Sequence, residues 1–405
     1  MVSGQASTAK WVVPLSAIAL AAAAGVIVAV MQTSSAAPDL QVLERIVVAP
    51  AEADNGLDTL TATNTIDDAV TFPDYLADLP GTPVDIELNQ ENGDLWILVV
   101  PADGDNLLLK NAAGTTDLIS YRLPKRGATP ANSALALSGR GDPVVALGDR
   151  VLFVNPETEQ YSELTLSPDT SGSVLIVGLD VAGETAILVR RDSQYLSEVS
   201  SDGETTEIKL PQGFETVDQL IAQGDWVWLI RKADSQGGAP AGIGLLNRLT
   251  GAFTTVSRKP FAADLLGERL IAATWAPLGL VSIAESGTTE ISVDDAGMDL
   301  LSRLGPDGVL EVGAEGQYVW ITAASLSSVG RISLDTGRSD VYDLPIYEIQ
   351  GTRVFCPPPE SESSGSACSE NFEMFTHVAA IVITSAGDVY FADTTMNRLG
   401  LISPQ

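Results

Sequence analysis

The chain has 405 residues, with 53 Asp and Glu against 22 Lys and Arg, so its formal net charge is −31. This charge disfavours binding to nucleic acid or to an anionic membrane surface, because like charges repel. Hydrophobic residues make up 45% of the chain, enough for a packed core. The acidic surface most simply keeps the protein soluble. Calcium capture is the alternative, although the short acidic runs lack the spacing of an EF-hand loop.

The N-terminus contains an uncharged apolar run at 11–31, after a polar segment in which Lys10 is the only charged side chain. As a helix, its 21 residues span about 30 Å, the thickness of a bilayer core. We therefore expect 1–10 to be a cytoplasmic tail, 11–31 a transmembrane anchor, and the rest of the chain to lie outside the cytoplasm. A cleaved signal peptide is the alternative, with Ser35-Ala36-Ala37 as the cleavage site.

The next segment, 32–56, is rich in Ala, Pro, Asp and Ser, a composition typical of a tether. Residues 57–405 are expected to form one domain, because Gly and Pro are spread through it without an interior boundary. A strand-like stretch at 59–65 precedes a connection at 66–82, and the first repeat begins at 83–88.

Seven short stretches in this domain begin with glycine and continue with β-branched, aromatic or aliphatic residues, the composition of a buried strand. They begin at Gly93, Gly148, Gly183, Gly224, Gly279, Gly316 and Gly387, at an average spacing of 49 residues. A period of about 40 to 50 residues with several strands per repeat is typical of a β-propeller. We therefore predict an all-β, seven-bladed β-propeller preceded by a single N-terminal transmembrane helix. Each glycine-led stretch is predicted to be the second strand of its blade.

The last repeat is one strand short of a blade. It has strand-like stretches near 378–384, 389–393 and 399–403, and the chain stops at Gln405. A propeller blade has four strands, so we expect the N-terminal stretch 59–65 to complete the last blade and close the ring.

The longest interval between repeats contains an insertion at 345–376, with the only two cysteines, Cys356 and Cys368. Two cysteines in a chain expected outside the cytoplasm predict a disulfide. We expect the loop between them to project over one face of the propeller near His377, as a lid or a partner contact. A tolerated surface insertion is the alternative.

A strand-turn-strand motif repeats most clearly near the C-terminus. Gly387–Asp393 reads GDVYFAD and is followed by NRLGLISP at Asn397–Pro404; Gly316–Thr322 reads GQYVWIT and is followed by VGRISLDTG at Val329–Gly337. A weaker copy, IGLLNRLTG, lies at 243–251. These repeats resemble those of the streptogramin lyase (virginiamycin B lyase) and NHL-type propellers, whose unit is G-x-x-W-F-T-E followed by N-x-I-G-R-I-x-P-x-T-G. The resemblance is faint over 83–240 and implies a propeller more specifically than an activity.

Streptogramin lyases open a cyclic depsipeptide by elimination across an ester bond, with a metal, a histidine base and a glutamate of the W-F-T-E motif. The resemblance implies that His377, the only histidine, is the base and that Asp393 is the accompanying acid. Glu285, the one acid that keeps the motif's final Glu, is the candidate metal ligand. The chain departs from the pattern in the longer spacing between His377 and Asp393, and the other metal and base positions do not map. No cofactor follows with certainty; Mg²⁺ and Ca²⁺ are the candidate metals. A histidine that packs at a strand end is the structural alternative.

No other catalytic motif is present: there is no G-x-S-x-G elbow, Walker loop or H-E-x-x-H. Five tryptophans are candidates for a sugar or peptide site, but most lie within or beside the repeated strands, where core packing is the simpler explanation. They are Trp96, Trp226, Trp228, Trp275 and Trp320.

These features favour a membrane-anchored extracytoplasmic β-propeller that acts as a binding or scaffolding module for an unidentified envelope protein or ligand. The interpretation leans away from an enzyme. The alternatives are a metal-dependent lyase or lactonase similar to streptogramin lyase, and a sensor whose acidic face captures divalent cations.

Overall fold

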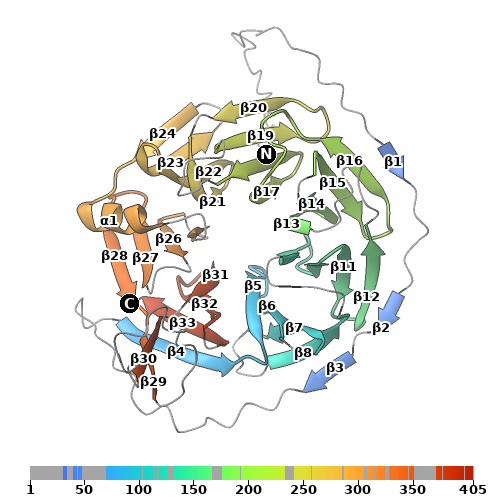
Figure 1. The fold of residues 1–405 in the computed structure, drawn as a ribbon, viewed down its shortest axis with the longest axis horizontal. Helices are drawn as coiled ribbons and strands as arrows, with labels where there is room; N and C mark the ends of the chain where they lie inside the picture. Colours follow the sequence, from blue (N-terminus) through green and yellow to red (C-terminus); the bar gives the residue numbers. More distant parts are fainter. Residues whose placement is uncertain are drawn as a thin grey trace, which may run out of the picture.

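Antiparallel sheets arranged as blades around a central axis make up the fold (Figure 1). The computed structural model describes residues 31–33, 40–42, 44–47 and 70–404. Within the last range, the gaps are 103, 114, 116–117, 126–128, 130–131, 167–175, 192, 233–240, 257, 285–286, 305–307, 314–315, 324–327, 345, 351–370, 376 and 396. The described residues form seven sheets of four or five strands and one two-stranded sheet. This confirms the predicted seven-bladed β-propeller.

The first three blades each have five strands, in order from the channel outward. Blade 1 contains β5 (Thr82–Leu88), β6 (Leu95–Val100), β7 (Asn106–Asn111), β8 (Leu118–Leu123) and β3 (Glu44–Val47). Blade 2 contains β9 (Ser133–Leu137), β10 (Pro143–Leu147), β11 (Arg150–Asn155), β12 (Gln160–Thr165) and β2 (Leu40–Val42). Blade 3 contains β13 (Ile176–Ala182), β14 (Thr185–Arg190), β15 (Tyr195–Ser200), β16 (Thr205–Lys209) and β1 (Met31–Thr33).

The other four blades have four strands each. Blade 4 contains β17 (Gln219–Gln223), β18 (Trp226–Arg231), β19 (Gly242–Asn247) and β20 (Phe253–Val256). Blade 5 contains β21 (Pro260–Leu266), β22 (Arg269–Trp275), β23 (Leu278–Ala284) and β24 (Gly287–Ile291). Blade 6 contains β25 (Gly308–Val312), β26 (Tyr318–Ala323), β27 (Ser328–Ser333) and β28 (Ser339–Asp343). Blade 7 contains β31 (Val378–Ile383), β32 (Val389–Asp393), β33 (Arg398–Pro404) and β4 (Val70–Asp78).

The predicted position of the glycine-led strands is right in five blades and wrong in two. Gly148 precedes β11 and Gly279 lies within β23, and both of these are third strands. In those blades the turn before the second strand contains Gly141 and Gly267, so successive second strands follow at intervals of 48, 42, 41, 43, 49 and 71 residues. The seven glycines that precede the second strands all have φ between 57° and 88°, a conformation that glycine adopts without strain.

The ring closes between the two ends of the chain, as predicted, but through a different segment. The last blade takes its fourth strand from β4, which pairs antiparallel with β33, whereas the predicted stretch 59–65 lies outside the described residues. The region 66–82 was expected to be a connection because of its prolines. β4 is an outermost strand, where Pro73 removes no hydrogen bond that the blade needs, and the register shifts beside it, between Leu401 and Ser403.

Three short strands near the N-terminus line the outside of the ring (Figure 1). β3, β2 and β1 pair antiparallel with the outer strands of blades 1, 2 and 3. Part of the predicted tether is therefore paired along the rim, and the last residue of the predicted anchor, Met31, lies in β1. Residues 11–30 lie outside the described residues. Within the described part of the chain, no helix is both long and apolar enough to span a membrane.

Packing between neighbouring blades forms the core. Second strands dominate it: every residue of β6 is buried, and Trp320 of β26 is 2% exposed. A single described helix, α1 (Asp295–Arg303), lies between blades 5 and 6 and buries Leu300 and Leu301 against them. Asp294 caps its first turn by accepting a hydrogen bond from the Gly297 N–H at 3.0 Å.

The predicted insertion begins and ends with a two-stranded sheet of β29 (Ile346–Gln350) and β30 (Asn371–Phe375). In the view of Figure 1 these strands lie toward the rim, beside the labels of β33 and β4, rather than over the channel. Cys356 and Cys368 lie outside the described residues, so their disulfide stays a prediction.

Candidate functional site

The innermost strands of the seven blades surround a cavity of about 370 Å³ in the central channel. All seven contribute to its lining: β5, β9, β13, β17, β21, β25 and β31. Its volume is in the range of cavities that bind small molecules. Five carboxyl groups face it, from Asp85, Glu87, Asp180, Asp264 and Glu311. The cavity is therefore both large enough for a ligand and strongly acidic.

The three aspartates have a shared geometry that follows from the ring. The Asp85 carboxylate accepts a hydrogen bond from the Leu135 N–H of the next blade at 2.9 Å. Asp180 accepts one from the Ala222 N–H at 2.6 Å, and Asp264 accepts one from the Val312 N–H at 2.8 Å. Blades 1, 3 and 5 thus each hold the inner strand of the following blade by one carboxylate. We call these residues the bridging aspartates.

Burial raises the pKa of each bridging aspartate to about 6, against an ordinary value of 3.8. The side chains are half-buried because they face the channel, but surrounding strands restrict water around the carboxylates. Hydrogen bonds from backbone N–H groups work in the opposite direction, because they stabilise the ionised form. These three groups are therefore largely ionised at neutral pH, at an energetic cost to the folded protein.

Glu87 and Glu311 lack the backbone hydrogen bonds that the bridging aspartates make, as far as the described residues show. Burial raises the pKa of Glu87 well above its usual range, and the charges of Asp85, Asp180 and Asp264 raise it further. Burial and then the charge of Asp264 act in the same way on the pKa of Glu311. These two carboxyls therefore hold protons more strongly than an ordinary glutamate, and a positive charge in the cavity would favour their ionised form.

Lys232 supplies the one positive charge among the described residues that line the cavity. It follows the last residue of β18, and its backbone N–H donates to the Asp218 carboxylate at 2.8 Å. The ammonium Nζ donates to the carbonyl of Gly308, the first residue of β25, at 3.0 Å. Lys232 therefore extends from blade 4 to blade 6 at the end of the channel where the inner strands begin.

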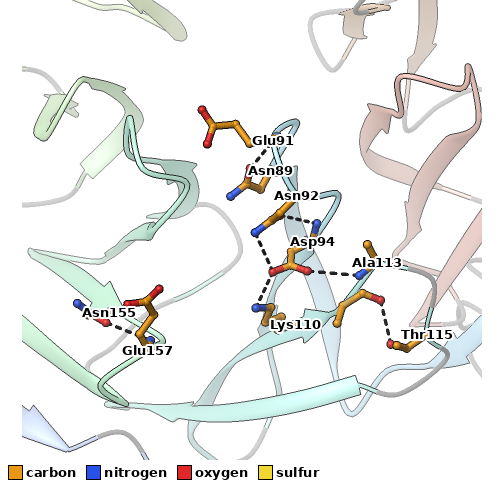
Figure 2. A network of polar contacts seen from close by, with 10 residues as sticks. Asn89, Glu91, Asn92, Asp94, Lys110, Ala113, Thr115, Asn155 and Glu157 are labelled. Carbon is orange, nitrogen blue, oxygen red and sulfur yellow. Dashed lines mark hydrogen bonds and ion pairs between the residues drawn. The ribbon is translucent and has the colours of Figure 1, made fainter.

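A polar network fixes the opposite end of blade 1, beyond the acids (Figure 2). In the turn from β5 to β6, the Asp94 carboxylate accepts from the Ala113 N–H at 3.3 Å and pairs with Lys110 at 2.6 Å. Lys110 also lies over the Trp96 ring, 5.3 Å from its centroid. Earlier in the turn, the Gln90 side chain donates to the Ile383 carbonyl of blade 7 at 3.0 Å. The turn that follows the strand of Asp85 and Glu87 is thus held both within blade 1 and by blade 7.

The arrangement is suited to a cationic ligand more than to a bare metal ion. Within the described residues, no three His, Cys, Asp or Glu side chains lie close enough to hold a metal. Separated carboxyls around a cavity instead match the dispersed positive charge of an organic cation, which needs neither short nor tetrahedral coordination.

Two of the residues predicted from the family resemblance, His377 and Asp393, lie outside the cavity lining. His377 is exposed just before β31, and its backbone N–H donates to the Thr395 hydroxyl at 3.0 Å. Asp393 is 0% exposed at the end of β32, and its carboxylate accepts from the Thr395 N–H at 2.9 Å. Both lie at the same end of blade 7, but neither is among the residues that line the cavity. Glu285 lies outside the described residues. The roles of all three stay predictions.

The tryptophans mostly occupy the core, as expected. Trp96, Trp228 and Trp320 are buried, Trp226 is half-buried, and Trp275 is 49% exposed beside Phe261.

Comparison with known proteins supports the fold. No family model matches the chain, and no curated protein matches it. A solved streptogramin B lyase matches with a TM-score of 0.59 and 14% identity over 84% of this chain and 100% of that one. Virginiamycin B lyase from Staphylococcus aureus matches at 0.56 and 15% over 80% and 97%. The extracellular domain of a hybrid two-component system from B. thetaiotaomicron matches at 0.51 and 11% over 83% and 43%. This chain is therefore structurally similar to virginiamycin B lyase and other β-propellers, and at these identities the likeness is one of fold.

Proposed function

We propose that this chain is a binding module whose central cavity takes a ligand that carries a positive charge. The observation that carries the proposal is the convergence of five carboxyls from four blades on one cavity of about 370 Å³. A structural role accounts for the bridging aspartates, which hold neighbouring blades. It does not account for Glu87 and Glu311, whose burial costs free energy without a described hydrogen bond in return.

A cation in the cavity offsets that cost. Burial and the nearby aspartates raise the pKa of Glu87 and Glu311, so both hold protons to a higher pH than an ordinary glutamate does. A bound ammonium group compensates the negative charge, lowers the pKa of both glutamates and releases protons to the solvent. Binding that is coupled to proton release is therefore the signature of this site.

The test uses the full chain and 1,5-diaminopentane as the probe, with 1,5-pentanediol as its uncharged match. Calorimetry at pH 7.5 in two buffers of different ionisation enthalpy measures both the affinity and the protons released. We expect the diamine to bind with proton release and the diol not to bind. Glu87→Gln and Glu311→Gln together should weaken diamine binding at least tenfold and abolish the release.

Glu204→Gln is the matched control, because Glu204 lies in an exposed turn at the rim of blade 3. This variant should bind like the wild type, whereas general attraction to the acidic surface would affect both variants alike. Diamine binding that is equal in all three proteins would refute the cavity as the site.

The proposal places the protein outside the cytoplasm, anchored by the uncharged run that ends just before Met31 of β1, with an envelope ligand or protein as its partner. Support comes from the uncharged N-terminal run, which is long enough to cross a bilayer as a helix. Mass spectrometry of the mature N-terminus from isolated membranes tests the anchor. A mature chain that begins near Ala37 or Pro38 would mean that the segment is cleaved.

A second candidate function is a metal-dependent lyase with His377 as the base. The position of His377 and Asp393 at one end of blade 7 favours it, since Thr395 contacts both residues. Purified protein with Mg²⁺ or Ca²⁺ should then open a cyclic depsipeptide ester, and His377→Ala should lose that turnover. Turnover that survives in His377→Ala, or is absent with both metals in the wild type, would eliminate this candidate.

A further inference from the structure

The lysine and the acids that line the cavity lie at different levels of the channel. Lys232 contacts Gly308, the first residue of β25, whereas Glu311 is the fourth residue of that strand. A strand rises about 3.3 Å per residue, so the two levels are about 10 Å apart along the channel. Asp264 and Asp180 lie at a comparable depth, each as the fifth residue of its inner strand.

Two hydrogen bonds fix the position of Lys232 at its end of the channel. Its backbone is fixed by Asp218, and its ammonium reaches across blade 5 to the Gly308 carbonyl. The Gln219 side chain, next to Asp218 in the chain, donates to the Ala263 carbonyl at 2.8 Å, so blades 4 and 5 are joined as well. The positive charge is therefore a fixed feature of one end of the cavity.

We propose that the ligand is an elongated zwitterion, in particular a peptide of two or three residues. Its ammonium group lies among the channel carboxyls and its carboxylate lies at Lys232; this assignment rests on the proposed function. An extended chain covers about 3.3 to 3.6 Å per residue, so the termini of a tripeptide are about 10 Å apart. That length matches the separation of the two charged levels. A carboxylate paired with a fixed ammonium also gains a charge-assisted hydrogen bond.

The test compares three peptides on the full chain by calorimetry at pH 7.5: triglycine, triglycine amide and N-acetyl-triglycine. Triglycine should bind about tenfold more tightly than the amide, which lacks the carboxylate. N-acetyl-triglycine lacks the ammonium and should not bind measurably. In Lys232→Met, triglycine should lose its advantage, while the amide binds at least as well as before.

Lys209→Met is the matched control, since it removes a lysine at the exposed end of β16 and should keep the tenfold preference. Thermal unfolding checks that each variant is folded, and Lys232→Gln serves if Lys232→Met is not. Equal affinities for triglycine and its amide in the wild type, or a preference that survives in Lys232→Met, would overturn the zwitterion while the cation site stands. If neither the peptides nor 1,5-diaminopentane bind, both the zwitterion proposal and the cation-site proposal are overturned.

Discussion

Stability should increase as the pH falls from 8 to about 4.5, the reverse of ordinary acid denaturation. The bridging aspartates have a pKa of about 6 in the folded protein, against 3.8 for an ordinary aspartate. Between these values the folded protein binds more protons than the unfolded chain, so the free energy of unfolding rises as protons are added. The gain is absent well above pH 6 and complete below 3.8.

The magnitude follows from the same values. Each pH unit between about 6 and 3.8 corresponds to about 1.4 kcal/mol, so full protonation of one bridging aspartate stabilises the fold by about 3 kcal/mol. At pH 4.5 about 2 kcal/mol of this is present for each aspartate, which makes about 6 kcal/mol for the three. Glu87 and Glu311 act in the same direction.

Two other effects contribute to the change in stability with pH and must be separated from the effect of the cavity carboxyls. Protonation also relieves repulsion across a chain of net charge −31, which adds to the gain. Exposed carboxyls with a lowered pKa oppose it: hydrogen bonds lower the pKa of Asp202, Glu215 and Asp294, so their stabilisation is lost as the pH falls. Because these carboxyls are exposed, their share is small.

Urea unfolding of the wild type and of the Glu87→Gln, Glu311→Gln double variant at half-unit steps separates the cavity from the surface. The variant loses only two of 53 acids, so surface repulsion is nearly unchanged. It should be more stable than the wild type at pH 8, and the difference should shrink toward pH 4.5. Two curves that run parallel over this range would show that the cavity carboxyls are ionised without cost, and the reasoning would fail.

Three further changes test the fold. Asp294→Ala removes the cap of α1 and should lower the free energy of unfolding by about 1 to 2 kcal/mol in a urea titration; no change would mean that water replaces the cap. In Gly400→Ala, the new Cβ would lie 2.1 Å from the Phe391 ring, which is fully buried, so we expect a loss of about 1 to 3 kcal/mol. A melting temperature equal to that of the wild type would contradict that packing. Cys356 and Cys368 should resist alkylation until a reductant is added, and rapid labelling without it would exclude the disulfide.

The number of blades could be predicted from the sequence because each blade repeats a local signal, a turn glycine followed by a buried strand. The position of strands within a blade could not be predicted everywhere. In blade 2, Gly141 and Gly148 both have positive φ and both precede an apolar strand. The second and third strands therefore look alike locally, and only pairing across the blade tells them apart.

The closing strand was missed for a related reason. Pro73 and Pro80 flank or interrupt the segment that contains β4, and prolines usually indicate a connection. An outermost strand pairs on one side only, so it tolerates a proline that an inner strand would not. Whether a strand is outermost depends on the closed ring, which the local sequence does not contain.

The acidic cavity could not be predicted from any single repeat of the sequence. Asp180 and Asp264 each stand three residues before a turn glycine, in D-V-A-G-E and D-L-L-G-E, and this recurrence is the one signal that could have found them. A single acid in an alternating strand usually points to solvent. Only the ring turns that side of an inner strand toward the channel and brings Asp85 and Asp264 together. His377 was predicted to be the base because it is the only histidine, but this gives no information about where it lies in the fold.

Substitutions of the two kinds of cavity acid should have different effects. Those of the aspartates should lower stability, and those of the glutamates should weaken ligand binding. Asp85 and Asp180 each use both carboxylate oxygens to accept hydrogen bonds from backbone N–H groups. An asparagine there would turn its NH₂ toward one of those donors, so substitution costs stability whether or not a ligand exists. Glu87 and Glu311 make no such described bonds, so a glutamine removes their ability to ionise without breaking the joints between blades. A protein selected only for folding gains nothing from two further glutamates in the channel beside three aspartates. Their presence is therefore better explained by a cation that enters the cavity than by the stability of the ring.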